Sequence, residues 1–438
     1  MDIYIETMGC PKNVNDSEAA AGILERAGHK VTGDISGAGA VIVNTCGFID
    51  DAKRESISKI FELARMKDEN AMLIVSGCLS QRYGDRIFKM IPEVDVFIGV
   101  NDYINLPGII ENFKHKREKH FSPCGDGYIE TPSRKFLEKP VSTTLKIADG
   151  CDNICAYCVI PEIRGGYRSR DMENIVTEAA SLAAQGCKEL IIVAQDVTAY
   201  GIDIYGRYEL PALLRRLCKI EGIRWIRLMY CYEDRITDEL IETMRDEEKI
   251  CKYIDMPVQH CSDKILNAMN RRSSGESIVS TIGRLRAAMP DIHIRTTLIT
   301  GFPGESGDEF SELLDFVREM EFERLGVFAY SKEDGTIAAE MKPQVRKNVK
   351  EARRDAILLS QLEISRAKNA EKTGGSMNVF VEGRESEGVY YGRTEYDAPE
   401  IDNSVVFTSH NAHVPGDIVK VEITDSFDYD LAGREVEP

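Results

Sequence analysis

The sequence has no uninterrupted apolar stretch of the ~20 residues that a membrane span needs, and cationic residues are in short supply. The 55 Lys and Arg residues face 73 Asp and Glu residues, which gives a net charge of −18. This balance argues against a protein that holds nucleic acid by charge alone. The first residues lack the basic stretch, apolar core and cleavage site of a signal peptide, so we expect a cytoplasmic protein.

The length of 438 residues predicts two or three domains, and the composition is not that of a disordered or collagen-like chain. The chain has 12 cysteines. In a reducing compartment this number argues against a disulfide framework. Metal ligation, catalysis and packing remain as uses for these cysteines.

The first ~115 residues alternate between strand and helix patterns, which predicts a doubly wound parallel sheet. We expect strands at 2–6, 40–44 and 71–76, with helices at 17–27 and 52–65. Cys10, Cys46 and Cys78 follow the three strands. Because ligands of such sheets bind beyond the carboxyl ends of the strands, these cysteines can converge on one metal site. Packing of buried cysteines is the alternative.

A connector is predicted next, because a charge run at 114–120 precedes a Gly-, Pro- and Ser-rich stretch at 122–134 that contains Cys124. A substrate-facing basic strip is the alternative for the charge run.

Six further β-then-α units predict an α/β domain with a partial (βα)6 barrel. Its strands are expected at 144–147, 190–194, 225–230, 253–256, 293–299 and 324–329. A helix at 345–368 closes this part. Short alternating segments then predict a small antiparallel β-barrel. These strands are expected at 377–381, 388–393, 404–407 and 417–424. The predicted division is 1–116, linker 117–136, 137–369 and 370–438.

The end of the first barrel strand carries Cys151, Cys155 and Cys158 in a C-x3-C-x2-C pattern. Three thiolates on one short loop can hold three irons of a [4Fe-4S] cluster and leave the fourth open. A zinc ribbon would need a second C-x2-C pair nearby, and the next cysteine is Cys187. A redox dithiol would not need Cys151.

This loop resembles that of the radical S-adenosylmethionine (SAM) superfamily, in which the open iron binds SAM. Tyr157 stands where that superfamily places an aromatic ring near the adenine, and residues 295–305 resemble its later SAM-contacting strand and turn. The residues that the resemblance predicts as SAM contacts are Tyr157, Gln195, Arg295, Gly301, Gly304 and Glu305. No general acid or base is assigned.

Both cysteine triads followed by a small terminal barrel resemble the methylthiotransferases over essentially the whole chain. The resemblance implies a second [4Fe-4S] cluster on Cys10, Cys46 and Cys78, whose open iron handles sulfur. It also implies a TRAM-like fold for the terminal barrel.

Local motifs resemble the RimO branch, which modifies an aspartate of small-subunit ribosomal protein twelve. These motifs lie at 9–18, 194–203 and 330–336. The implied reaction replaces a hydrogen on the aspartate β-carbon with a methylthio group. The implied partners are this basic protein or the assembled subunit, a sulfur donor, and an electron donor such as flavodoxin or ferredoxin. A tRNA methylthiotransferase is the alternative, and a non-catalytic iron–sulfur protein is a more distant one.

The terminal segment 372–438 has 5 Lys and Arg against 14 Asp and Glu, a net charge of −9. Such a barrel favours a basic protein partner over tRNA. A surface that only keeps the domain soluble is the alternative. Its aromatics could recognise a partner, but we expect at least half of them to pack in the core. They are Phe380, Tyr390, Tyr391 and Tyr396.

Two local departures from the family pattern affect the expected substrate contacts. Residues 230–234 replace a histidine-proline pair, and Cys261 follows Gln259 and His260 where a smaller or aliphatic residue is usual. His260 is a candidate polar contact, although a structural role is the simpler interpretation. We expect the remaining barrel cysteines to pack in the core. They are Cys187, Cys218, Cys231, Cys251 and Cys261.

Overall fold

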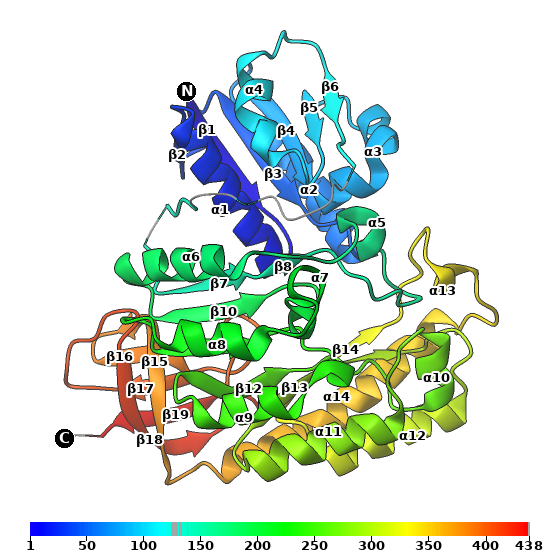
Figure 1. The fold of residues 1–438 in the computed structure, drawn as a ribbon, viewed down its shortest axis with the longest axis vertical. Helices are drawn as coiled ribbons and strands as arrows, with labels where there is room; N and C mark the ends of the chain where they lie inside the picture. Colours follow the sequence, from blue (N-terminus) through cyan, green and yellow to red (C-terminus); the bar gives the residue numbers. More distant parts are fainter. Residues whose placement is uncertain (124–129, 131–133, 138, 437–438) are drawn as a thin grey trace.

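The computed structural model describes residues 1–123, 130, 134–137 and 139–436 (Figure 1). Cys124 lies outside the described residues. Among the helices that are described, none has the length and apolarity to cross a membrane.

The N-terminal part is a six-stranded parallel sheet between two helical layers (Figure 1). In spatial order its strands are β2 (Lys30–Thr32), β1 (Asp2–Thr7), β3 (Ala40–Thr45), β4 (Met72–Gly77), β5 (Val96–Ile98) and β6 (Glu118–His120). One face is covered by α1 (Pro11–Arg26) and α4 (Leu106–Glu111), and the other by α2 (Asp50–Met66) and α3 (Cys78–Met90). The apolar runs of β3 and β4 are wholly buried, as expected for central parallel strands.

The sheet contains the three predicted strands and three more. The additional strands β2, β5 and β6 have three residues each, too few to show a clear periodicity. β6 pairs with β5 although it lies within the charge run at 114–120. An edge strand needs backbone partners but no apolar side chains, which is why its composition resembles a connector.

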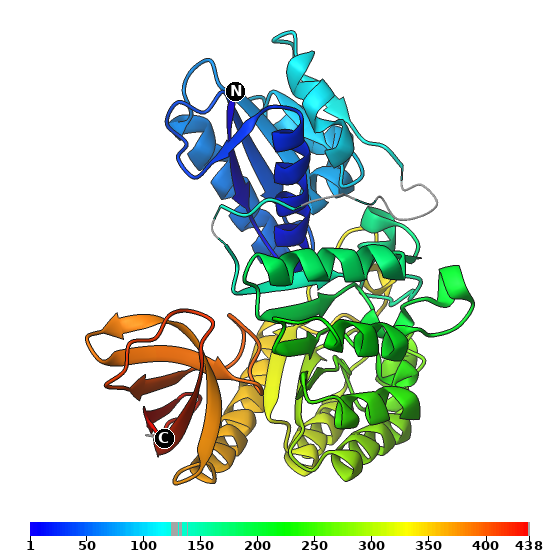
Figure 2. The same cartoon turned by 60° about the vertical axis from the view of Figure 1, so that its left-hand side comes forward.

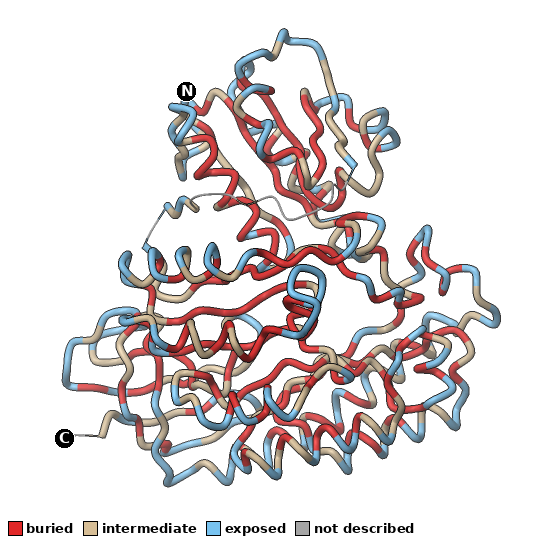
Figure 3. The backbone as a smooth tube through the Cα atoms, viewed as in Figure 1, coloured by how far each residue is buried: buried red, intermediate tan, exposed pale blue. Residues whose placement is uncertain are grey.

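The central part is an open parallel sheet whose six strands occur where the sequence predicts them (Figure 1). In spatial order they are β14 (Arg324–Ala329), β13 (His293–Thr300), β12 (Ile250–Asp255), β11 (Trp225–Leu228), β10 (Glu189–Val193) and β7 (Ser142–Lys146). The long helices are α6 (Met172–Ala184), α8 (Leu210–Cys218), α9 (Asp238–Asp246), α11 (Gly275–Ala288), α12 (Gly307–Met320) and α14 (Lys347–Ala370). Most of their inward faces and one face of the sheet form a single hydrophobic core, seen as the buried layer in Figure 3.

Shorter elements decorate this sheet. They are β8 (Ala148–Asp149), β9 (Arg168–Ser169), α5 (Ile160–Arg164), α7 (Ile202–Tyr205), α10 (Asp263–Ala268), α13 (Ile337–Glu340) and 3-10 turns at Tyr103–Asn105, Val197–Ala199 and Glu233–Arg235. All five cysteines that we expected to pack in the barrel are buried in hydrophobic clusters.

The C-terminal part is a closed five-stranded barrel beside the central sheet (Figure 2). Its strands are β15 (Ser376–Ser386), β16 (Val389–Thr394), β17 (Val405–Thr408), β18 (Ile418–Ser426) and β19 (Leu431–Glu435). The sequence predicted four antiparallel strands. The fifth strand, β19, closes the barrel by pairing in parallel with β17, a long-range contact that no local pattern reveals.

The barrel packs against the concave face of the central sheet at the amino ends of its strands. Phe380 packs on Trp225 with 5.4 Å between ring centroids. Phe380 and Tyr390 are core residues, whereas Tyr391 is exposed and Tyr396 stacks on His293. The expectation that at least half of these aromatics pack is therefore confirmed.

A fully buried ion cluster joins the terminal barrel to the sheet. Glu189 of β10 binds Arg393 of β16 and lies 3.0 Å from the Nε atom of Arg227 in β11. Burial alone would raise the pKa of Glu189, but the guanidinium groups of Arg393 and Arg227 outweigh burial and hold this pKa at about 2.

We predict that Glu189→Gln lowers the free energy of unfolding by about 3–5 kcal/mol at pH 7, because two buried guanidinium groups lose their counter-ion. Because the pKa of Glu189 is depressed, its stabilisation is present above the unfolded value of ~4.3 and is lost as the pH falls toward about 2. The difference between the two proteins in urea unfolding should therefore shrink at acidic pH. The control is Glu173→Gln at an exposed pair with Arg216, which should change little. Equal losses in both variants would contradict the prediction.

Candidate functional site

The N-terminal cysteines occupy the carboxyl ends of three neighbouring strands. Cys10 follows β1 and precedes α1, Cys46 directly follows β3, and Cys78 directly follows β4. In the strand order β2-β1-β3, successive strands are added first on one side of β1 and then on the other. The crevice between β1 and β3, where this order reverses, is the usual ligand-binding site of such folds. The sequence prediction that these three positions share one edge of the sheet is confirmed.

Tight backbone packing brings the three cysteine loops together. Gly9 has φ +96°, and a Cβ atom added there would lie 2.7 Å from the Cβ of Cys46. A Cβ at Gly47 would lie 2.9 Å from the carbonyl carbon of Cys78. Real Cβ atoms do not approach this closely, so glycine is needed at both positions.

The second set, Cys151, Cys155 and Cys158, lies on the loop between β8 and α5, beyond the carboxyl end of β7. Each sulfur has a polar neighbour. Asn153 donates to the Sγ atom of Cys151 at 3.4 Å, and the Ile160 N–H donates to that of Cys158 at 3.4 Å. The Tyr232 hydroxyl lies 3.3 Å from the Sγ atom of Cys155.

Burial keeps several of these thiols protonated in the free protein. It raises the pKa of Cys46 and of Cys151 to about 11, and that of Cys158 to about 12. Burial also raises the pKa of Cys78, although the charge of Arg164 opposes this effect. Metal binding at either set must therefore displace protons.

The donor set suits an iron–sulfur cluster better than a single ion. In the described part of the chain, no group of three or more His, Cys, Asp or Glu side chains is arranged to hold one metal ion. A [4Fe-4S] cluster places each cysteine on a different iron, so its ligands need not converge on one ion. Thiols with hydrogen-bond donors around them are the surroundings in which such clusters are tuned. The residues therefore fit the cluster.

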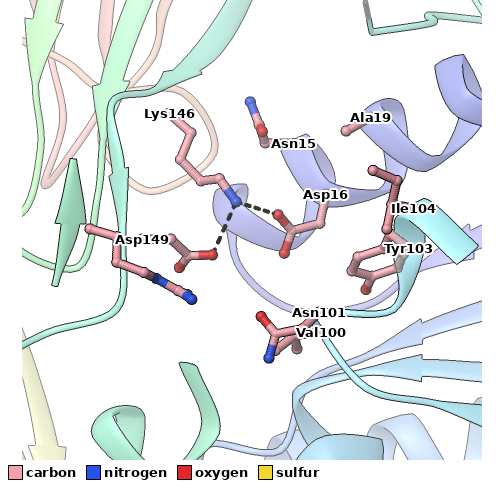
Figure 4. A pocket seen from close by; sticks show the side chains of 10 residues that line it. Asn15, Asp16, Ala19, Val100, Asn101, Tyr103, Ile104, Lys146 and Asp149 are labelled. Carbon is pink, nitrogen blue, oxygen red and sulfur yellow. Dashed lines mark hydrogen bonds and ion pairs between the residues drawn. The ribbon is translucent and has the colours of Figure 1, made fainter. Parts of the chain in front are cut away.

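A buried charge network joins the two sets, and Figure 4 shows the part of it in which Lys146 contacts Asp16 and Asp149. Lys146, at the end of β7, lies 2.6 Å from Asp16 of α1 and 3.3 Å from Asp149. Arg164 of α5 lies 2.8 Å from Asp16 and 3.1 Å from Asp149. The Arg164 nitrogen that faces Asp16 also donates to the Sγ atom of Cys78 at 3.5 Å. The network thus fixes the loop that carries Cys151, Cys155 and Cys158 against the N-terminal sheet.

The charges of this network are mutually compensated. Burial alone would raise the pKa of Asp149, but Arg164 and then Lys146 outweigh burial and lower it. Asp16, Lys146 and Asp149 of this network border a cavity of about 50 Å³ between the two domains (Figure 4).

A second ionic link closes the other side of the interface. Arg82 of α3 and Lys53 of α2 both bind Glu333, at 2.9 and 2.8 Å. Arg82 also donates to the carbonyl oxygens of Gly47 and Asp334 at 2.8 Å each. The loop after Cys46 is thus tied to the loop after β14.

A wide cavity of about 900 Å³ opens between these links and the edge strand β14. Phe48 and Ile49, just after Cys46, line one side. Tyr157, next to Cys158, and Thr297 of β13 line another. The cavity is therefore lined by residues that are close in sequence to one cysteine of each set, and it is large enough for a substrate segment.

Three family models match successive parts of the chain. An uncharacterized protein family, UPF0004, matches residues 2–99, the radical SAM superfamily matches 145–317, and the TRAM domain matches 373–436. These assignments agree with the predicted fold classes.

Relatives extend over nearly the full length. The ribosomal protein uS12 methylthiotransferase RimO of Acetivibrio thermocellus is 49% identical over 99% of this chain and 98% of the relative. The RimO proteins of Geobacter sulfurreducens and Thermoanaerobacter sp. are 46% and 44% identical, each over 99% of this chain and over 98% and 99% of the relative. This chain belongs to the RimO family.

Solved structures support the fold at low sequence identity. The radical SAM methyltransferase TsrM of Kitasatospora setae has a TM-score of 0.56 and 13% identity, over 89% of this chain and 77% of TsrM. The cobalamin-dependent radical SAM enzyme OxsB has a TM-score of 0.52 and 13% identity, over 83% of this chain and 56% of OxsB.

The predicted SAM contacts of this RimO-family chain lie in different surroundings. Tyr157 lines the wide cavity. Gln195 donates to Asp149 at 2.9 Å, while its Oε1 atom is buried without a partner among the described residues. Arg295 pairs with Asp255 and, across to the terminal barrel, with Asp402.

The turn at Gly301–Glu305 is held mainly by protein contacts. A Cβ at Gly301 would lie 2.3 Å from a side-chain atom of Lys350, so the glycine is needed for packing against α14. Glu305 accepts from the Gly301 N–H at 2.8 Å and pairs with Arg353 at 2.5 Å, whereas Gly304 faces open space. His260 is fully buried and lies 3.6 Å from Glu305, which favours a structural role for this histidine. Direct SAM contact by this turn stays a prediction.

Sequence reasoning missed the residues that surround the cysteines. Lys12 and Asn13 lie two and three positions after Cys10, and Arg164 lies six positions after Cys158. Their proximity to the cysteines along the chain was a usable signal, but nothing local indicated that Asp16, Lys146 and Arg164 would meet.

We predict that Arg164→Met lowers the free energy of unfolding of the reconstituted enzyme by about 3–5 kcal/mol, because Asp16 and Asp149 lose a buried partner. Arg164→Lys keeps the charge and should lose less. Arg65→Met removes an exposed arginine of α2 and should stay within about 0.5 kcal/mol of the parent. Urea unfolding checks all three, and an Arg164→Met variant as stable as the Arg65 control would show that the network does not hold the domains.

Proposed function

We propose that this chain is a radical SAM methylthiotransferase that replaces a hydrogen on the β-carbon of an aspartate of ribosomal protein uS12 with a methylthio group. The observation that carries the proposal is the meeting of two cysteine sets across one interface, in a chain that belongs to the RimO family along its whole length. A reaction that needs both a radical and a sulfur nucleophile or donor requires two such sites at close range.

Cys151, Cys155 and Cys158 are the proposed ligands of the SAM-binding [4Fe-4S] cluster. When bound there, the cluster supplies the electron that cleaves SAM into methionine and a 5′-deoxyadenosyl radical able to take hydrogen from carbon. Asn153, the Ile160 N–H and Tyr232 surround the three sulfurs with donors, which favours the reduced cluster. Tyr157 faces the cavity where the substrate would lie.

Cys10, Cys46 and Cys78 are the proposed ligands of a second [4Fe-4S] cluster. When bound, this cluster offers an open iron that holds the sulfur to be transferred. Arg164 contributes a positive charge and a hydrogen bond at Cys78. The links through Asp16 and Glu333 keep this sulfur site facing the SAM site.

The substrate assignment rests on the relatives' name and on charge. The segment 372–438 carries a net charge of −9, and one of its few cations, Arg393, is buried. Phosphate backbones bind to cations, so this barrel favours basic uS12, alone or in the assembled subunit, over tRNA. The proposal includes a flavodoxin- or ferredoxin-like electron donor, a sulfur donor, and action in the cytoplasm.

We expect the anaerobically reconstituted enzyme, given SAM, reductant and sulfide, to form methionine and 5′-deoxyadenosine and to add a methylthio group to uS12. Mass spectrometry of uS12 and of nucleosides from tRNA in a gene-deletion strain tests the substrate. An unmodified uS12 in the deletion strain with unchanged tRNA supports the proposal. Loss of methylthio-adenosine from tRNA with an unchanged uS12 mass would assign the tRNA reaction instead.

The cluster assignment predicts about eight irons per chain. Triple alanine replacement of Cys151, Cys155 and Cys158 should lower this to about four and abolish SAM cleavage. The same replacement of Cys10, Cys46 and Cys78 should also leave about four, but SAM cleavage should persist without product. As a matched control, Cys187→Ala and Cys218→Ala should keep the full iron content, because both thiols lie in the hydrophobic core. Iron assays and 5′-deoxyadenosine quantitation test these expected values. A full iron content in either triple variant would contradict the assignment.

A further inference from the structure

Lys12 is a buried lysine whose charge is not compensated by a carboxylate. It lies in the first turn of α1, two positions after Cys10, and its residue exposure is only 9%. Among the ion pairs formed by the described residues, none involves the Lys12 ammonium group. A lysine that is largely buried without a counter-ion is costly, so its retention calls for a ligand or a local partner.

The partner that the fold provides is an aromatic ring. The Lys12 Nζ atom lies 3.5 Å from the centroid of the Tyr230 ring, at the carboxyl end of β11. Tyr230 has φ +58°, a left-handed conformation that a tyrosine rarely adopts. Its N–H donates to Asp255 at 3.0 Å, and its carbonyl oxygen accepts from Val197 at 3.1 Å. This constrained backbone holds the ring against Lys12.

A ring face attracts a cation but does not neutralise it, so Lys12 remains able to bind an anion. The neighbouring cations differ in this respect. Lys146 and Arg164 are each paired with both Asp16 and Asp149. Lys12, by contrast, pairs with no carboxylate of the described residues, so its charge is available to a ligand.

The position of Lys12 is as informative as its charge. Lys12 stands two positions after Cys10 of one set, and it faces the ring of Tyr230. Tyr230 stands two positions before Tyr232, whose hydroxyl lies 3.3 Å from the Sγ atom of Cys155 of the other set. A substrate carbon that loses hydrogen at the SAM site and gains sulfur at the second site must pass between these cysteines. Lys12 therefore lies where the reacting part of the substrate arrives.

We propose that Lys12 binds the side-chain carboxylate of the substrate aspartate and makes the enzyme selective for an acidic side chain. This inference rests on the proposed function. In an aspartate the carboxylate carbon is bonded directly to the β-carbon that reacts, so a cation that grips the carboxylate also positions that carbon. A neutral nucleobase offers no such anion. Lys12 is a specificity-determining residue, and Tyr230 is its positioning residue.

The test measures how the holoenzyme distinguishes a carboxylate from an amide. The probes are recombinant uS12 and a uS12 whose target aspartate is replaced by asparagine, which removes the charge but keeps the shape. In anaerobic equilibrium binding with SAM present, the parent enzyme should prefer the aspartate form by roughly 10- to 100-fold, the range for hydrogen bonds to charged groups. Lys12→Gln should bind the two forms with about equal affinity, and Lys12→Arg should retain part of the preference.

Lys219→Gln is the matched control, because it removes the same charge from an exposed position directly after α8, away from the wide cavity. It should leave the preference intact. Iron content and 5′-deoxyadenosine formation without uS12 report whether each variant keeps its clusters. If Lys12→Gln loses iron, the preference for the aspartate form is still measured in the parent enzyme and in Lys12→Arg, and these two values test the inference.

Three outcomes would overturn the inference. They are equal affinity of the parent enzyme for the two uS12 forms, a preference that survives Lys12→Gln, and an equal loss in the Lys219 control. A Lys12→Gln variant with an altered cluster reduction potential but an unchanged preference would mean that Lys12 serves the clusters alone. In each case the parent enzyme's modification of uS12, measured separately by mass, shows whether the proposed function still stands.

Discussion

The structure depends on one constraint, which is that two cysteine sets borne by different domains must face each other at a fixed separation. The network of Asp16, Lys146, Asp149 and Arg164 meets this constraint from one side. Two acids and two bases alternate there, so each charge has two opposite neighbours. Buried pairs of this kind add little net stability compared with apolar packing, but they are intolerant of displacement. The relative position of the two domains is therefore set by the directions and distances of these ion pairs more than by the apolar area that the interface buries.

The second link, from Arg82 and Lys53 to Glu333, gives the interface a different property. It connects helices α2 and α3 to the loop after β14, and Glu333 of that loop lines the wide cavity. One side of the interface is thus held by the buried network and the other by a link to a loop. The wide cavity beside that loop is the side from which the proposed substrate would enter. The glycines beside Cys10 and Cys46 fit this arrangement, because they let the cysteine loops pack on each other and leave the cavity side clear.

Much of this architecture is local enough to be predicted from the sequence. The six central strands and the strand-end cysteines follow from apolar periodicity and from the geometry of parallel sheets. What could not be predicted depends on long-range pairing. β6 is a charged edge strand, and β19 pairs in parallel with β17 to close the barrel. For the site, the cysteines were evident from spacing, whereas the association of Lys12 with Tyr230 joins residues 218 positions apart and has no local signature.

The acidic terminal barrel has to be interpreted with its place in the fold. It attaches through Glu189 and Trp225, at the amino ends of strands whose carboxyl ends carry the reaction site. A strand of five residues is about 16 Å long, about twice the Debye length in physiological salt. The barrel's charge is therefore screened at the cysteines and cannot select the reacting side chain. It can act only on the part of a basic partner that touches the barrel itself. Recruitment of the substrate protein and choice of its aspartate must then be separate events, and the second requires a cation inside the interface, where solvent does not screen it.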